Sequence, residues 1–179
     1  MLHLREKTSG IDCEIQEMQK DIYDALTGAF QFKNVEAYGR LYRNETNDGI
    51  RPQWFSSQVA DYETVYLDDT KDIILSFIDG ETHNTVDGFT YVAPVKIVFW
   101  FNLDKIEVNH YPDAEAQRIA SVILKENVFN ELQFKQLEKG LRNVYSGFNT
   151  GDIRFDNMNP YHVFSLNIDL TYQLTKICE

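Results

Sequence analysis

A strict alternation of apolar and polar residues near the end of the chain constrains the fold more than any other feature. Within residues 161–175, every second residue from Phe164 to Leu174 is apolar, and the residues between them are polar. This two-residue period, held over six apolar positions, predicts a long β-strand with one buried face and one wet face. A helical period would distribute the same side chains around the helix axis. A second long strand, residues 92–103, is its expected partner.

The size and charge of the chain narrow the classes of protein that fit it. With 179 residues and 43% apolar content, the chain can bury a core of its own, and we expect a single domain over residues 1–179. The formal net charge of −11 leaves no basic footprint for specific nucleic-acid binding. The acidic excess suits simple solubility, a basic partner, or a surface that must not adhere to DNA.

The cellular location of the protein and the state of its two cysteines are inferred from signals that the sequence lacks. The first residues do not form a signal peptide, and no apolar run approaches the ~20 residues of a membrane span. We therefore expect a soluble cytoplasmic origin and no membrane contact. Cys13 and Cys178 lie at opposite ends of the chain, without the spacing of a zinc site. They could bridge if the termini meet, but two unpaired thiols in a reducing compartment are the expectation.

Helical spacing recurs in three segments. Residues 11–26 carry apolar side chains at steps of three and four, which predicts an amphipathic helix of about five turns. This helix is expected to lie on a sheet or, alternatively, on its copy in a neighbouring subunit. A second helix is predicted for residues 113–125. Phe134, Leu137 and Leu141 have the spacing of a further short helix.

The middle of the chain predicts one long β-hairpin. Residues 71–78 are apolar on both faces, which is typical of a central strand. Residues 91–103 form the returning strand, and the polar loop 79–88 joins the two. The hairpin 71–103 is therefore a candidate for a segment that projects from the domain. With a short strand at 152–158, the pattern predicts an α+β fold with a mainly antiparallel sheet and helices on one face.

Chemical motifs are weak throughout. Asp68, Asp69 and Asp72 lack the spacing of a calcium loop, and a solvated turn before a strand explains them better. His110 stands near Asp113, but Asp113 is better explained as a helix cap. We predict no catalytic residue, no cofactor site and no metal site. The alternative is a soluble enzyme or small-ligand-binding module with a site near His83, His110 and Asp113.

Aromatic residues on nominally wet strand faces are the more informative feature. Trp100 shares a face with Lys96 and Asn102 on its strand. Such residues are enriched at protein–protein interfaces, but another element of the same chain could equally cover them. Both interpretations stay open at this point. The candidate interface residues are Tyr38, Tyr42, Trp54, Phe55, His83, Asn84 and Trp100.

The predicted order of elements resembles that of tailed-phage tail-terminator and neck (connector ring) proteins. The opening helix, the long hairpin with its polar tip, the helix after Asp113 and the closing strand all have counterparts in that plan. The segments 152–155 (D-I-R-F), 159–161 (N-P-Y) and 169–174 (D-L-T-Y-Q-L) are similar to the ends of such proteins in phages of Bacteroides-like gut hosts. The resemblance spans most of the chain and is topological in kind.

The resemblance implies a virion structural protein without enzyme activity. It implies a homo-oligomeric ring, a hexamer or dodecamer, that contacts other neck or tail proteins. DNA would pass through the lumen of the ring without specific binding. A closed ring needs a head-to-tail interface, which we expect from the hairpin and the edge strands. An adaptor dimer joined through the first helix is a further alternative.

Overall fold

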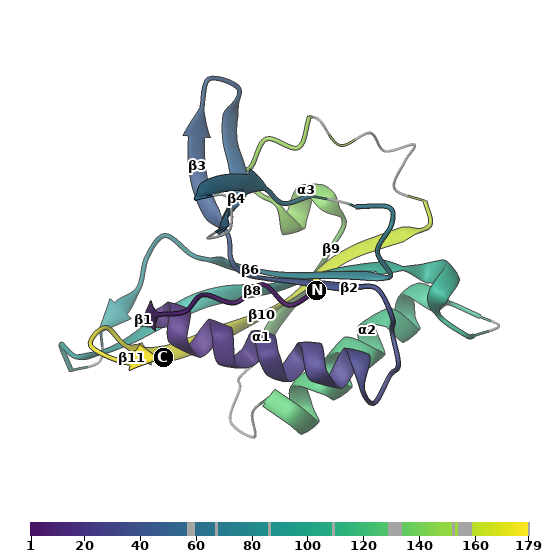
Figure 1. Cartoon of the computed structure of the whole chain (residues 1–179), viewed down its shortest axis with the longest axis horizontal. Coiled ribbons are helices and arrows are strands. Elements are labelled where there is room, and N and C mark those ends of the chain that lie inside the picture. Colours follow the sequence, from purple (N-terminus) through teal and green to yellow (C-terminus); the bar gives the residue numbers. More distant parts are fainter. Residues whose placement is uncertain are drawn as a thin grey trace.

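A mainly antiparallel sheet forms the centre of the computed structural model, which describes residues 1–56, 60–66, 68–85, 87–108, 110–128, 134–151, 153 and 159–178. The sheet has six strands in the order β2–β6–β8–β10–β9, and β7 pairs with β8 beside that path (Figure 1). β2 and β6 run parallel, and the other pairs run antiparallel. The strands are β2 (Val35–Arg40), β6 (Ile73–Asp79), β7 (Asn84–Thr85), β8 (Thr90–Asn102), β9 (Phe134–Lys139) and β10 (Tyr161–Gln173). The predicted α+β class is confirmed.

The two longest strands are those that the alternation predicts. β8 and β10 pair along all 13 residues of each strand, from Asn102 opposite Tyr161 to Thr90 opposite Gln173. At ~3.4 Å per residue, this ribbon is about 40 Å long. β6 lies between β2 and β8, so its prediction as a central strand is confirmed. The 71–103 hairpin therefore forms the middle of the sheet.

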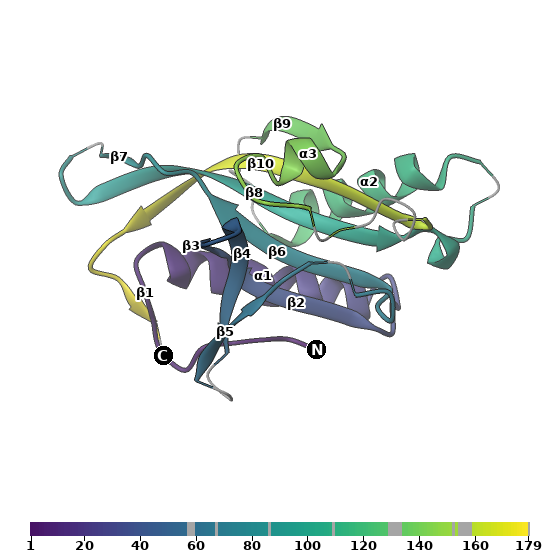
Figure 2. The same ribbon diagram turned by 90° about the horizontal axis from the view of Figure 1, so that it is seen from above.

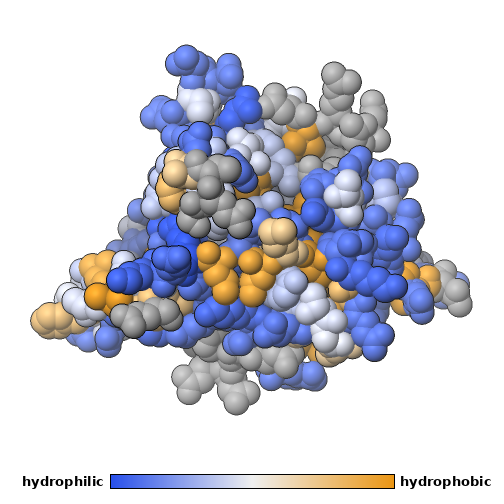
Figure 3. All heavy atoms as spheres, viewed as in Figure 1, coloured by the Kyte–Doolittle hydropathy of each residue, from blue (hydrophilic) through white to orange (hydrophobic). Residues whose placement is uncertain are grey.

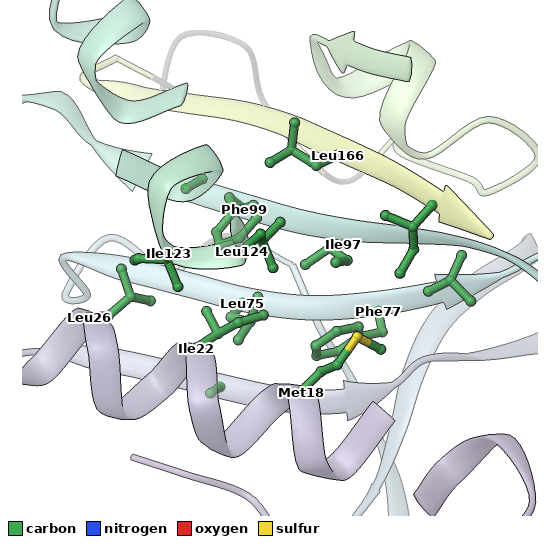
Figure 4. Close-up of a cluster of buried hydrophobic side chains, with 14 of the residues drawn as sticks. Met18, Ile22, Leu26, Leu75, Phe77, Ile97, Phe99, Ile123, Leu124 and Leu166 are labelled. Atoms are coloured by element: carbon green, nitrogen blue, oxygen red, sulfur yellow. The ribbon is translucent and has the colours of Figure 1, made fainter. Parts of the chain in front are cut away.

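Helices α1 (Ile11–Thr27) and α2 (Pro112–Ile123) cover one face of the sheet (Figure 1). A short 3₁₀ helix, η1 (Leu103–Lys105), follows β8, and one π-helical turn, η2 (Leu124–Val128), extends α2. The apolar stripe of α1 meets the alternating residues of β6 and β8, while Ile123 lies beside Leu26 of α1 and Leu124 beside Phe99 of β8 (Figure 4). The helix predictions at 11–26 and 113–125 are thus confirmed, and α1 lies on its own sheet.

The opposite face of the sheet is covered by a second, smaller sheet and a short helix. A three-stranded sheet, β3 (Tyr42–Thr46), β4 (Gly49–Ser56) and β5 (Asp61–Thr64), lies over it with the short helix α3 (Leu141–Val144). Trp100 points into this second core, where its Nε1 donates a hydrogen bond to the hydroxyl of Tyr145 at 2.8 Å. The chain itself therefore covers the aromatic face of β8.

The predicted short helix over Phe134, Leu137 and Leu141 is wrong in its first part. Residues 134–139 form β9, an edge strand that pairs with β10, and only residues 141–144 are helical. The spacing of three and four does fit a helix, but the unpaired edge of β10 supplies backbone partners that the sequence does not reveal. The predicted strand at 152–158 lies outside the described residues, apart from Ile153.

The expectation of two unpaired thiols is wrong, because Cys13 and Cys178 form a disulfide. Strands β1 (Thr8–Ser9) and β11 (Ile177–Cys178) pair antiparallel beside the first turn of α1. This pairing brings the two Cα atoms within 5.6 Å, a separation that a disulfide spans. The bond links the beginning of α1 to the last described residue of the chain.

Candidate interaction surface

The outer edge of β9 is an open sheet edge. Within the described part of the chain, β9 pairs with β10 and with no other strand. All of its residues are exposed except the half-buried Glu138, and Phe134 and Leu137 keep 44% and 41% of their surface in water. A strand of this kind presents unpaired backbone groups beside apolar side chains, which is a ready template for a partner.

The opposite edge, at β2, is covered by the first residues of the chain. Leu2 forms a parallel bridge with Ala37. The amide of His3 donates to the carbonyl of Ala37, and the amide of Ala37 donates to that of Met1, both at 2.9 Å. Gln19 on α1 also donates to the Ala37 carbonyl at 2.8 Å. The outward backbone groups of Ala37, in the middle of β2, therefore have partners within the chain.

A buried carboxylate fastens this covered edge. Glu36 on β2 accepts hydrogen bonds from Lys71, at 2.9 Å, and from His3. Burial alone would raise the pKa of Glu36, but these hydrogen bonds outweigh it and hold that pKa below its ordinary value. Tyr38 stacks on His3 and meets the edge of Trp54. Burial, with Glu36 nearby, raises the pKa of Tyr38.

The outer face of the three-stranded sheet carries a small aromatic patch. Tyr42 and Phe55 each contact Tyr62, with ring centroids 5.4 and 5.2 Å apart. The guanidinium of Arg40 lies 5.1 Å from the centroid of the Tyr42 ring. Tyr62 is 40% exposed, so this patch is accessible. Two of the candidate interface residues, Tyr42 and Phe55, thus lie together beside a third aromatic that belongs with them.

The tip of the long hairpin brings His83 and Asn84 to one end of the molecule. His83 is hydrogen-bonded to the hydroxyl of Tyr172 at 2.7 Å, and Asn84 is exposed in β7. Phe89 is 75% exposed at this tip. Figure 3 shows hydrophobic residues at the end of the molecule where this hairpin extends. The tip therefore combines polar and apolar contact groups.

Three other candidate residues are less available. Trp54 and Trp100 are 4% and 0% exposed, because both fill the core between the two sheets. They offer no surface to a partner, so they are removed from the set of candidate interface residues. Tyr38 is half-buried against His3 and Trp54 and can present only part of its ring. A pattern of alternating aromatics does not distinguish a face covered by the same chain from a face covered by another.

The residues of the alternative enzyme site are not brought together. His83 lies beyond the end of β6, at the hairpin end of the central sheet. His110 and Asp113 follow the other end of β8, about 40 Å of strand away (Figure 1). Asp113 instead acts electrostatically on His162, whose pKa is lowered chiefly by burial and only partly restored by Asp113. His162 is hydrogen-bonded to Gln117 at 2.9 Å.

The aspartates near residue 70 accept hydrogen bonds from neighbouring groups of the same chain. Asp72 accepts hydrogen bonds from the amides of Lys33 and Asn34, at 3.2 and 3.0 Å. Asp68 accepts from the amide and hydroxyl of Thr70. Among the described residues, no three His, Cys, Asp or Glu side chains gather in a way that could hold a metal ion. An open hollow of about 520 Å³ lies between residues 29–34 and the start of α2.

Comparison with known proteins identifies no relative, so the candidate surface is interpreted from its geometry. No protein-family profile matches the chain, and a search of curated proteins finds no match. No helix among the described residues has the length and apolar character needed to cross a membrane. The open edge of β9 is therefore the principal candidate surface. Its sequence signal was the pair Phe134 and Leu137, which the expected short helix explained equally well.

Proposed function

We propose that this protein is a structural subunit of a ring at the neck or tail of a tailed phage, acting as a tail terminator or a head–tail connector component. The observation that carries the proposal is the difference between the two edges of the central sheet. β9 is open and exposes Phe134 and Leu137, whereas β2 is covered by the chain's own first residues. A subunit with one open edge favours head-to-tail contacts between unlike surfaces, and such contacts generate rings.

Two further features support this role. The projecting hairpin tip, with exposed Phe89 and Asn84, offers a contact for the next subunit or for another neck or tail protein. The net charge of −11 suits a lumen through which DNA moves without specific binding, since like charges repel. The resemblance in the order of elements points in the same direction, and the proposal assigns no catalysis to the chain.

Assembly of the purified protein is the direct test. Native mass spectrometry and sedimentation velocity should give particles of six or twelve chains of 20.9 kDa, and negative-stain images should show closed rings. Assembly could depend on a preformed partner, so binding to purified tail tubes is measured in parallel. A chain that stays monomeric at high concentration and also ignores the tubes would contradict the proposal.

A pair of matched variants tests the open edge. Leu137→Asp places a charge in the exposed apolar part of β9, and we expect it to abolish rings while leaving a folded monomer. Val108→Asp is the control, because Val108 is 39% exposed against 41% for Leu137 but lies far from β9 in the loop before α2. Rings that survive Leu137→Asp unchanged would remove β9 from the assembly surface.

A further inference from the structure

We propose that the disulfide between Cys13 and Cys178 is a redox latch, open while the protein is made and assembled in a reducing host cytoplasm and closed after the particle leaves it. The latch consists of these two cysteines and residues 174–178, which reach from the end of β10 to the beginning of α1. The two compartments rest on the proposed function. The latch itself belongs to the single chain and is tested without any ring.

The latch joins the hairpin end of the β8–β10 ribbon to the helices on one face of the sheet. β10 ends at Gln173, which is paired with Thr90 beside the hairpin tip. The chain then turns back as β11, and Cys178 is bonded to Cys13 in the first turn of α1 (Figure 2). A closed latch therefore fixes the end of the ribbon relative to α1.

Side chains of the hairpin tip contact the residues of β10 that precede the latch. The hydroxyl of Tyr172 is hydrogen-bonded to His83 at 2.7 Å, and its ring stacks on Tyr91 with ring centroids 5.7 Å apart. His83 is also hydrogen-bonded to the carbonyl of Gly80 at 3.0 Å. The tip is one of the proposed contacts with a partner. Fixing it slows the release of a bound partner, because fewer unbound conformations compete with the bound one.

The non-covalent contacts of the latch segment are weak. β1 and β11 form two residue pairs, and isolated pairs of short strands are at best marginally stable in water. Leu174 and Ile177 are 55% and 72% exposed, so the segment buries little apolar surface. Lys176 pairs with Glu14 at 2.8 Å and with Glu17 at 3.4 Å, but ion pairs at the surface contribute little. We therefore expect this segment to detach from α1 when the disulfide is reduced.

Thiol–disulfide exchange opens the latch from the side of Cys178. Cys178 is half-buried and Cys13 is fully buried, so an incoming thiolate attacks the sulfur of Cys178 and forms a mixed disulfide there. The electron pair of the broken S–S bond leaves on Cys13 as a thiolate, in the first helical turn, where the helix dipole favours negative charge. The hydroxyl of Thr8 also donates to this sulfur, at 3.6 Å. A second thiolate then frees Cys178 and forms a small-molecule disulfide.

The reverse reaction closes the latch and needs an oxidant. The two cysteine thiols pass two electrons and two protons to a small-molecule disulfide such as oxidised glutathione, which leaves as two thiols. Cytoplasmic thiols keep protein cysteines reduced, whereas disulfides form and persist outside the cell. The newly made chain then carries the two unpaired thiols that the sequence suggests. The bond in the folded structure corresponds to the released particle.

Limited trypsin digestion measures the state of the latch. Lys176 provides a cleavage site inside the latch segment, and its carbonyl accepts a hydrogen bond from the amide of Gly10 at 2.9 Å. We expect dithiothreitol to speed cleavage after Lys176 at least about tenfold, because the detached segment fits the protease. Mass spectrometry detects the loss of residues 177–179. Cleavage after the exposed Lys105 is the internal reference and should keep its rate.

A matched variant removes the bond without a reductant. The double variant Cys13→Ser, Cys178→Ser replaces each sulfur by a smaller oxygen and should be cleaved after Lys176 as fast as the reduced wild type. Added dithiothreitol should not change its rate. Circular dichroism establishes that the variant is folded. If it is not, wild type reduced and blocked with iodoacetamide takes its place.

Glutathione buffers determine where the latch opens. The protein is equilibrated at an about 1,000-fold excess of reduced over oxidised glutathione, as in a reducing cytoplasm, and then with oxidised glutathione in excess. Thiol labelling and intact mass give the open fraction. At least about half of the molecules should be open in the first buffer and nearly all closed in the second. A latch that stays closed in both would overturn its opening in the host.

The outcomes separate this inference from the function on which its compartments rest. Equal cleavage after Lys176 in the oxidised and reduced chain would overturn the latch, and so would equal acceleration after Lys105, which indicates general unfolding. The reduced chain should form rings as well as the oxidised chain does. Rings formed by the oxidised chain alone would overturn closure after assembly. A chain that forms no ring in either state, alone or on tail tubes, but whose cleavage responds to reductant would overturn the proposed function and leave the latch.

Discussion

The two edges of the central sheet are formed by strands of equal length, but one edge is covered by the chain and the other is exposed to solvent. β2 and β9 each have six residues and each pairs with one neighbouring strand. β2 buries Val35, Glu36 and Ala37 and is covered by the first residues of the chain, whereas β9 leaves almost every side chain in water. The covered edge belongs to the core, and the exposed edge remains available for association.

The covered side should account for most of the stability that single residues contribute. Its helix α1 also carries the disulfide between Cys13 and Cys178, which are 165 residues apart in sequence. Closing so long a loop restricts the unfolded chain strongly, so Cys13→Ser should lower the free energy of unfolding by about 4 kcal/mol. Urea denaturation measures this loss. Reductant should destabilise the wild type equally and leave the variant unchanged; a variant as stable as the oxidised wild type would contradict the prediction.

Apolar truncation compares the two edges directly. Val35 on β2 is 1% exposed and Leu137 on β9 is 41% exposed. Val35→Ala should lower the free energy of unfolding by about 2.5 kcal/mol, because it removes buried methyl groups and leaves a cavity. Leu137→Ala should cost less than about 0.5 kcal/mol in the monomer, although it removes more atoms. Equal losses in thermal unfolding of the two variants would mean that β9 is buried in solution.

The same comparison explains how far the sequence predicts this fold. β10 is predictable because it keeps a two-residue period over a length that no helix matches, and β8 because it is a long run rich in β-branched and aromatic residues. The stretch F-K-Q-L-E-K of β9 has no such period, and it becomes a strand only through the backbone partners that β10 offers. Local pattern therefore identifies the central strands β8 and β10 but not the edge strand β9.

The second core was hidden from the sequence for a different reason. Trp54, Trp100 and Tyr145 come from distant segments and meet only after β4 and α3 fold across the sheet. Each aromatic, read alone, fits a contact within the chain or between chains. The disulfide likewise depends on a two-residue pairing of β1 with β11, which no periodicity indicates. Of the candidate surface, the sequence located Tyr42, Phe55 and the hairpin tip, but it missed β9.

A single lysine should show how β9 is held in place. Lys96 on β8 reaches across the sheet to Glu138 and also donates to the carbonyls of Asn143 and Val144, at 3.0 and 3.3 Å. Lys96→Met keeps the aliphatic part of the side chain but removes these bonds. We expect a loss of about 1 kcal/mol, because the groups are only partly buried.

Amide hydrogen exchange measures where in the sheet the Lys96→Met substitution has its effect. The amides of β9 and α3 should exchange faster in Lys96→Met, while those of β2 keep their wild-type rates. Arg118→Met is the control, since Arg118 pairs with Glu115 on the exposed side of α2 and contacts neither edge strand. Uniform acceleration throughout the sheet would contradict a role for Lys96 confined to the β9 side.

The smallest effect concerns the pH dependence of the covered edge. The pKa of Glu36 is held below its ordinary value of 4.5 by hydrogen bonds from His3 and Lys71, although burial opposes them. A carboxyl with a lowered folded-state pKa stabilises the protein above its unfolded-state pKa, and this stabilisation disappears as the pH falls through the folded value. Urea unfolding from pH 7 to pH 3 should therefore show a steeper loss below about pH 4.5 in the wild type than in Glu36→Gln. Glu138→Gln at the open edge serves as the comparison. If Glu36→Gln reproduced the whole acid limb of the wild type, the Glu36 cluster would not be what fastens the covered edge.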